Sequence, residues 1–356
     1  MKTQAPLMPA LAAALLATLL PAAAQAQATV SIYGSIDAGL RYQTNTDAAG
    51  RGKLTMSSGN FYSNRLGFRG AEDLGNGLKA RFQLESGFNA KTGALDNTNN
   101  VLFNRTAAVG LGGKWGYIDV GRQYTIGFRT EKFLDPFDHH FTPIVPLSSG
   151  AGTTLPPAAS AAGLSASSSS GTRFNNDVQY SGSFDKLTLR AEYALGENAE
   201  SSKRGAARAL GFSYSGDTLL AAGAYTQKQT QAGFDNRAFV VGGGAKVAGV
   251  TVKAGLSRER QQTATAGTYQ NETRFGGASY RIARALDLTA AVYRSVYDSA
   301  AGGGKRDLFL LGASHAFSKR SNLYVEFDLN RYGGALVPAS KQTSQRGASM
   351  GLMHMF

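Results

Sequence analysis

Apolar and polar residues alternate along several stretches of the chain. The even-numbered positions of 78–84 are apolar and the residues between them are charged or polar, and the stretches 187–193, 250–256 and 323–329 alternate in the same way. A period of two is typical of β-strands that present one face to an apolar environment and the other to water. The sequence therefore predicts an all-β fold. A soluble β-sandwich would show the same alternation, so the period alone leaves two architectures open.

The lengths of the connectors favour a barrel that crosses a membrane. Long connectors are expected near 43–61, 89–101, 123–172, 196–206, 227–235, 259–271, 299–304 and 333–344. Short connectors are expected near 70–77, 112–116, 182–186, 216–217, 247–249, 283–286 and 318–321. Eight long and seven short connectors separate sixteen strands. An even number of antiparallel strands, with short turns on one side and long loops on the other, is the layout of outer-membrane barrels.

Two properties of the predicted strands agree with this architecture. Strands of about ten residues are long enough to cross a bilayer at a tilt, and their charged faces suit a water-filled lumen. A closed barrel is also the only sheet whose backbone is fully hydrogen-bonded in lipid. The sequence therefore predicts a 16-stranded antiparallel transmembrane β-barrel.

The N-terminus has the pattern of a secretory signal. An apolar stretch follows Lys2 and ends in Ala24-Gln25-Ala26, which fits the small-residue cleavage pattern. Pro21 interrupts the apolar stretch, which argues against a membrane anchor. We therefore expect a signal peptide at 1–26 and the barrel at 27–356, although Ala28 also fits the cleavage pattern.

Composition narrows the function classes. The chain has no cysteine, so disulfides and thiolate metal sites are excluded, and its formal net charge is +13. The basic residues are scattered singly, so no nucleic-acid patch is expected, and the charge indicates anionic solutes or lipopolysaccharide as partners. Adjacent His139 and His140 lack a third metal ligand, and the glycine-rich stretches do not fit a nucleotide motif, so we expect neither a metal nor a cofactor.

Several stretches resemble a known family. They are "VSIYGSIDAGLRY", "NRLGFRGAEDLGNGLKARFQLESGF", "LFNRTAAVGLGGKWGYIDVGRQYT" and "TRFNNDVQYSG", together with the terminal Phe356. In this order they resemble the trimeric general porins of Gram-negative outer membranes, closest to the anion-preferring branch. The resemblance implies a homotrimer in the outer membrane. Gly34, Ala38 and Gly39 on the first strand are expected where neighbouring subunits meet.

The resemblance also gives roles to the C-terminus and to the longest connector. Phe356 is expected to end the strand that closes the barrel against the first strand, and to act as an assembly signal. The connector 123–172 is the third long loop, which in this family folds into the barrel and narrows it. Its acidic residues Glu131, Asp135 and Asp138 are the candidates for the loop side of the constriction, and which of them lines the pore is left open.

An arginine cluster is expected on the wall opposite this loop. By resemblance it consists of Arg65, Arg122 and Arg173. Strand parity places Arg65 and Arg173 inward, whereas strict alternation would turn Arg122 outward unless a bulge at Gly121 redirects it. The alternative is that these arginines cap strand ends at the lipid headgroups. Further lumen-lining basic residues are predicted to be Arg41, Lys79 and Arg81.

Facing an acidic loop, such arginines would favour anions. The sequence is therefore interpreted as an outer-membrane porin, a passive diffusion channel for small hydrophilic solutes with a preference for anions. An adhesin or receptor barrel that acts through its loops is the alternative. An outer-membrane enzyme is a more distant one, because no Ser-His pair stands out and apolar neighbours favour packing for His315.

Overall fold

The computed structural model describes residues 29–97, 100–141, 172–263, 267–300 and 302–356. The predicted signal peptide and the second half of the loop 123–172 lie outside the described residues. No helix within these ranges has the length and apolar character needed to cross a membrane.

The described residues form strands and the helix α2 (Ile126–Leu134). The strands are β1 (Thr29–Gln43), β2 (Lys53–Ser58), β3 (Arg65–Gly75), β4 (Leu78–Gly87), β5 (Thr106–Gly113), β6 (Gly116–Tyr124), β7 (Arg173–Phe184), β8 (Leu187–Ala194), β9 (Ala207–Ser215), β10 (Leu219–Gln229), β11 (Asp235–Val247), β12 (Val250–Thr263), β13 (Gly267–Ala283), β14 (Leu286–Asp298), β15 (Gly304–Ala316), β16 (Ser321–Gly334) and β17 (Ser344–Met355). All neighbours pair in an antiparallel manner, and β17 pairs with β1 to close the sheet.

Two of these strands share one place in the barrel. β2 pairs with the second half of β1, from Ala38 to Gln43, and β3 pairs with its first half, from Thr29 to Ser35. The seventeen strands of the sheet therefore make sixteen barrel positions, and the predicted closed 16-stranded barrel is confirmed. Residues 59–64, which we call the strand break, separate the two pieces.

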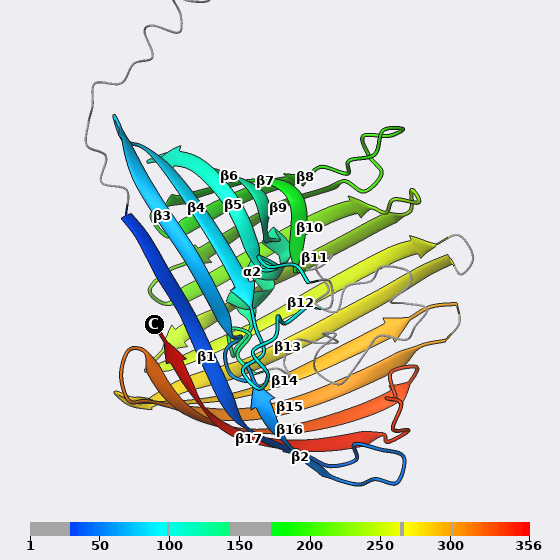
Figure 1. Cartoon of the computed structure of the whole chain (residues 1–356). Coiled ribbons are helices and arrows are strands. Elements are labelled where there is room, and N and C mark those ends of the chain that lie inside the picture. Colours follow the sequence, from blue (N-terminus) through cyan, green and yellow to red (C-terminus); the bar gives the residue numbers. More distant parts are fainter. Residues whose placement is uncertain (1–28, 98–99, 142–171, 264–266, 301) are drawn as a thin grey trace, which may run out of the picture.

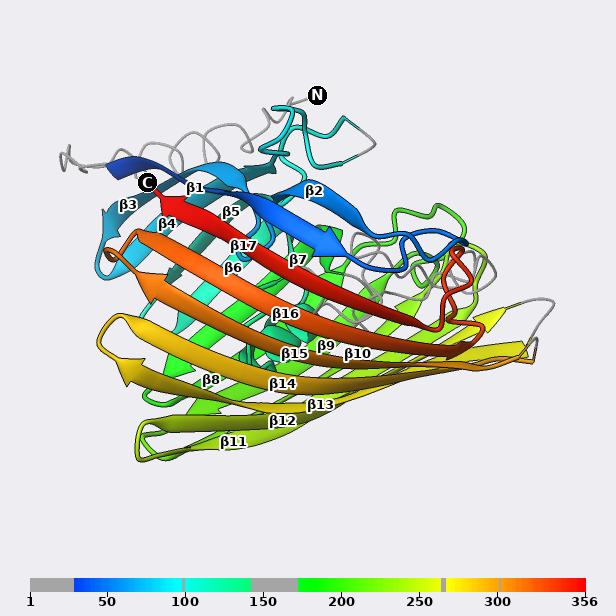
Figure 2. The same ribbon diagram turned by 90° about the horizontal axis from the view of Figure 1, so that it is seen from below.

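The positions of the loops and turns follow the predicted alternation, with three corrections. The expected loop 43–61 contains β2, and β12 and β13 extend into the expected loop 259–271. β3 extends to Gly75 and so occupies most of the expected turn 70–77. Figures 1 and 2 show the short turns gathered at the end of the barrel where the C-terminus lies. Asn76 and Gly77 both have positive φ, of 53° and 80°, as the tightest hairpin turns require.

The polarity of the two faces of the sheet is opposite to that of a soluble protein, with apolar side chains outside and polar side chains inside. On β1 the outward Ile32 is 64% exposed and Leu40 51%, whereas the inward Asp37 is fully buried. Apolar side chains outside and polar side chains inside are expected for a barrel in lipid. This arrangement distinguishes the fold from the soluble sandwich that the alternation had left open.

The last residue completes the barrel. Phe356 exchanges two backbone hydrogen bonds of 3.1 Å with Gly34 of β1. Leu352 and Phe356 are 51% and 47% exposed on the outer face. The role of Phe356 as an assembly signal stays a prediction.

Candidate pore constriction

The described part of the third long loop packs against the inner wall. Helix α2 begins after Thr125, whose side chain accepts a hydrogen bond from the Phe128 backbone at 3.1 Å, and the helix contacts β8 to β12. Figure 1 shows it inside the ring of strands. On the buried side of the helix, Ile126 packs on Gly211 of β9 and Leu134 packs on Gly242 of β11. There is no room for a Cβ atom at either glycine. Glycines on the wall thus make room for the helix.

The loop tip, residues 135–141, continues across to the opposite strands. Phe137 and Phe141 pack on Gly312 of β15, and Phe141 lies edge-to-face with Tyr324 of β16 at 5.7 Å between ring centroids. The described loop therefore reaches from β6, where it begins, to β16.

The strand break supports the loop tip. Asp37 accepts hydrogen bonds from the backbone N–H groups of Phe61 at 2.7 Å and Tyr62 at 2.6 Å, and from the Tyr324 hydroxyl at 2.6 Å. The Phe61 ring lies 4.4 Å from His140 and 5.1 Å from Phe141, between ring centroids. The interruption of the second barrel strand thus places two aromatic residues under the tip of the third loop.

The three acidic residues of the loop lie in different surroundings. Glu131 is 1% exposed and faces the wall, and burial, then Asp135 and Glu259, raises its pKa well above the ordinary value. Burial raises the pKa of Asp135 to about 7, although its hydrogen bond from Tyr293, 2.5 Å long, acts in the opposite direction. Only Asp138 is open to the lumen, with a side chain 55% exposed and an ion pair to Lys253 at 2.6 Å.

The histidines beside these acids are uncharged at neutral pH. Burial lowers the pKa of His139 to about 3 and that of His140 to about 4. Across the ranges that the structure describes, no three His, Cys, Asp or Glu side chains gather to hold a metal ion.

On β3 to β7 a group of arginines faces this loop. Glu85 forms ion pairs with Arg65 at 3.6 Å and Arg105 at 2.9 Å. The hydroxyl of Tyr124 accepts hydrogen bonds from Arg105 and Arg173, each 2.7 Å long. We call Arg65, Arg105 and Arg173 the basic wall. Arg65 and Arg105 thus share the carboxylate of Glu85, and Arg105 also forms an ion pair with Asp96 at 3.5 Å.

Arg122 lies apart from this group. A bulge is present, since Gly121 has φ of 132° and the register with β7 shifts between Gly121 and Gln123. The Arg122 side chain, however, donates to the Asn104 carbonyl at 2.7 Å and to the Asn175 side chain at 2.5 Å. No described hydrogen bond or ion pair joins it to the basic wall, so its place in the constriction stays a prediction.

Arg105 was missed by the sequence reasoning, although a signal existed. Asn104-Arg105 repeats the dipeptide Asn64-Arg65 at the start of a strand. Both asparagine side chains accept a backbone hydrogen bond from a neighbouring strand, Asn64 from Asp37 at 2.5 Å and Asn104 from Gly87 at 2.9 Å. The repeated dipeptide therefore marks two equivalent positions from which an arginine enters the lumen.

The other predicted basic residues lie outside the basic wall. Arg41 is 9% exposed and bridges Glu326 at 3.0 Å and Asp328 at 2.7 Å. Arg81 forms an ion pair with Asp119, and Lys79 is exposed near the turn of β3 and β4. Because Arg41 is paired with two carboxylates, it adds little to the positive potential of the lumen.

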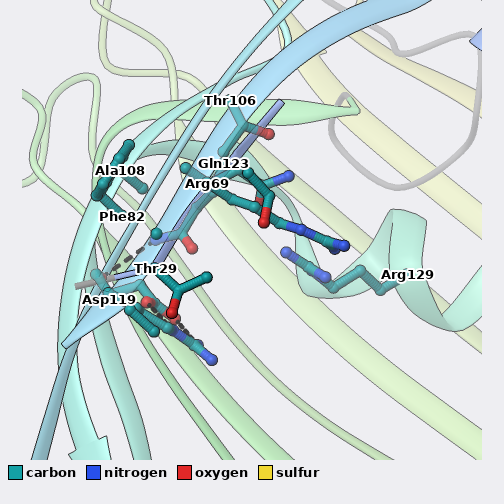
Figure 3. A pocket seen from close by; sticks show the side chains of 13 residues that line it. Thr29, Arg69, Phe82, Thr106, Ala108, Asp119, Gln123 and Arg129 are labelled. Carbon is teal, nitrogen blue, oxygen red and sulfur yellow. Dashed lines mark hydrogen bonds and ion pairs between the residues drawn. The ribbon is translucent and has the colours of Figure 1, made fainter. Parts of the chain in front are cut away.

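A second basic region lies beside the helix. A cavity there has a volume of about 520 Å³. Two of the residues that line it, Arg69 of β3 and Arg129 of α2, extend toward one another in Figure 3. Arg81 also lines it, and Asp119 is the one carboxylate among the residues described there. Basic side chains therefore continue from the basic wall toward the end with short turns.

The comparisons with known proteins agree with this geometry. Residues 10–335 match the model of a family described as Gram-negative porin. The chain belongs to this family. It is 28% identical to outer membrane porin protein 32 of Delftia acidovorans, over 94% of this chain and 96% of that protein. The family consists of channels rather than enzymes, and the protein is located in the Gram-negative outer membrane.

Solved porins share the fold. An anion-selective porin from Comamonas acidovorans has a TM-score of 0.75 and 23% identity, over 93% of this chain and 100% of that one. OmpT of Vibrio cholerae, solved in a trimer form, has a TM-score of 0.64 and 14% identity, over 92% of this chain and 99% of that one. At these identities the likeness concerns the fold alone.

Proposed function

We propose that the chain forms a passive, water-filled channel that prefers small anionic solutes, and that the basic wall sets this preference. The single observation that carries the proposal is the imbalance of charge across the lumen. For the three arginines of the basic wall, the ion pairs involve two carboxylates, Glu85 and Asp96, while Glu131 and Asp135 are buried against the opposite wall. A permeating anion that passes between the two sides would meet more positive than negative charge.

Because such a constriction is narrow, a few charges in it would be enough to set the ion preference. Two unit charges 4 Å apart interact by about 1 kcal/mol in bulk water, but by about 4 kcal/mol at an effective dielectric constant near 20. Guanidinium groups remain charged at any working pH. Residues that line a constriction should therefore outweigh the more numerous charges of the outer loops, which salt screens.

Assembly and export complete the proposal. We infer a homotrimer that meets along β1, where Gly34 and Ala38 lie between the exposed Ile32, Ile36 and Leu40. Gly39 was predicted at the same surface. It instead lies on the inner face with Asp37 and Arg41, because alternate residues of β1 point to opposite faces and the outward apolar residues occupy the even-numbered positions. Export would use a signal peptide at 1–26, leaving a mature chain of 27–356. The proposal assigns no catalytic role and no cofactor.

Planar-bilayer recording of the purified protein tests this function. The proposal predicts stable, ohmic channels and, in a gradient of potassium chloride, a reversal potential of the sign expected for chloride. An adhesin barrel with a plugged lumen would give no stable conductance, and a reversal potential of the opposite sign would overturn the anion preference.

A further inference from the structure

Arg173 is held differently from the other two arginines of the basic wall. Arg65 and Arg105 both form ion pairs with Glu85. Within the part of the chain that the structure describes, Arg173 forms no ion pair with a carboxylate. It donates hydrogen bonds to the Tyr124 hydroxyl at 2.7 Å and to the hydroxyl of the adjacent Thr172 at 3.3 Å. The position of Arg173 therefore depends on uncharged groups, of which Tyr124 makes the shorter contact.

The same hydroxyl also holds Arg105. Both arginines donate from their Nη2 atoms to the Tyr124 oxygen over 2.7 Å, so these two nitrogen atoms lie no more than twice this distance apart. Two cations this close repel each other, and an acceptor between them reduces the repulsion. A carboxylate in this place would also cancel one of their charges. A neutral acceptor leaves both charges available to a permeating anion.

The local structure fixes the Tyr124 side chain. Tyr124 and Arg173 are direct partners across β6 and β7. The Arg173 guanidinium carbon lies 4.2 Å from the centroid of the Tyr124 ring, which is the geometry of a cation–π contact.

The loop helix provides a further contact. Phe128 of α2 stacks on the Tyr124 ring, with 5.1 Å between centroids and 14° between the ring planes. Thr125, which caps the N-terminus of α2, is the next residue along the chain. Tyr124 is thus placed by the wall and by the loop helix together, and its oxygen in turn places two arginines.

We propose that Tyr124 is a positioning residue for anion selectivity, whose hydroxyl holds Arg105 and Arg173 side by side at the lumen without neutralising them. This inference rests on the proposed function, since it concerns how two arginines of the basic wall are held. Without the hydroxyl, Arg173 loses its shorter hydrogen bond, and repulsion drives the two guanidinium groups apart. The positive charge is then spread over a larger volume and acts less strongly on an anion in the constriction.

Tyr124→Phe tests the proposal, because it removes the hydroxyl and keeps the ring with its contacts to Arg173 and Phe128. The full chain is recorded in planar bilayers under a gradient of potassium chloride. The ratio of chloride to potassium permeability should fall by roughly two- to tenfold, where the upper value corresponds to the loss of one hydrogen bond to a charged group. The conductance and the current noise should stay close to those of the wild type, as evidence that the barrel folds and the loop stays docked.

A double-mutant comparison separates positioning from a general structural effect. Arg173→Gln should lower the permeability ratio in the wild-type background and should lower it much less in the Tyr124→Phe background. Residues that act through one shared contact are not additive in this way, whereas independent effects would add. Full additivity of the two changes would therefore overturn the proposal.

Tyr117→Phe is the matched control on the same strand. The Tyr117 ring lies 3.7 Å from the guanidinium carbon of Arg81, but no hydrogen bond of its hydroxyl is present among the described residues. This variant should keep the wild-type permeability ratio, and an equal loss in it would overturn the specific role of Tyr124. A wild-type channel without anion preference would refute the proposed function itself. An anion-selective wild type whose ratio falls in Arg173→Gln but not in Tyr124→Phe would refute only the role of Tyr124.

Discussion

At the scale of single residues, the three acids of the pore loop differ in exposure rather than in chemistry. Glu131 and Asp135 are each 1% exposed, whereas the Asp138 side chain is 55% exposed and lies beside Lys253. An ion in the lumen therefore interacts most directly with Asp138. The other two carboxyl groups instead affect how firmly the loop packs on the wall.

Replacing Asp138 with asparagine should increase the preference for anions, because it removes a lumenal negative charge and leaves Lys253 unpaired. Replacing Glu131 with glutamine should leave the preference nearly unchanged, since this side chain is 1% exposed and faces the wall, away from the lumen. Reversal potentials of the two variants, measured under the same salt gradient, test this contrast. A larger shift from Glu131 than from Asp138 would contradict the assigned orientation of the helix.

Asp135 should make the packing of the loop weaker as pH rises. Burial raises the pKa of Asp135 from 3.8 to about 7, so through this residue the docked loop binds a proton more tightly than the undocked one. This contribution is fully present below about pH 4 and is lost between about pH 4 and 7. His139 and His140 act in the opposite direction, because burial lowers the pKa of His139 to about 3 and that of His140 to about 4. Comparison of single-channel current noise in wild-type protein and Asp135→Asn isolates Asp135. The wild type should become noisier relative to the variant as pH rises across this interval, and the reverse trend would contradict the sign.

At the scale of elements, the strand break and the pore loop form one unit. The backbone of 59–64 is held by Asp37, and Phe61 contacts both His140 and Phe141. The loop tip therefore has a fixed support on the barrel wall. The described contacts place this support on β1 to β3 and on β16, opposite the strands that hold helix α2.

Replacing Phe61 with alanine should loosen the loop tip, since the loss of a buried phenylalanine typically costs roughly 3–5 kcal/mol. We expect frequent partial closures in single-channel records, with little change in the melting temperature of the barrel. Phe327→Ala is the control, because Phe327 is 57% exposed on the outer face. Steady currents from the Phe61 variant would show that the strand break does not hold the loop.

The sequence could predict features that neighbouring residues determine, but not features that depend on contacts between distant segments of the chain. Strands and turns were predictable because alternation and turn residues are local, as at Asn76 and Gly77. β2 was missed because the strand break separates a six-residue strand from β3. The orientation of Glu131 could not be predicted, since it follows from the docking of α2 on glycines of distant strands. The same holds for Arg105, which Glu85 and Tyr124 bring to the other arginines.

At the scale of the whole molecule, the outside of the barrel has two different surfaces. On β1, small residues lie among exposed apolar ones, whereas exposed arginines lie at the long-loop ends of other strands, from Arg208 on β9 to Arg346 on β17. The first surface suits contact with another subunit, and the second suits contact with the headgroups of the membrane.

A bulky residue in the first of these surfaces should weaken the trimer. Replacing Ala38 with phenylalanine would separate neighbouring walls, because small residues allow close approach. Light scattering in mild detergent should show trimers for the wild-type chain and a shift toward monomers for the variant. An equally large residue at Ala221 of β10, on the opposite side of the barrel, serves as the control. Wild-type protein that is monomeric in mild detergent would count against the proposed assembly.

The most direct test of the central claim is the reversal potential after removal of two charges from the basic wall. Replacing Arg65 and Arg173 with glutamine leaves Arg105 to pair with Glu85, so no buried carboxylate loses all its partners. Replacing Lys203 and Arg204 of an outer loop changes the net charge by the same amount and serves as the control. We predict that the wall variant shifts the reversal potential toward zero or toward cations with conductance largely kept, while the control shifts it little. A wall variant with the wild-type reversal potential would contradict the claim that these arginines set the selectivity.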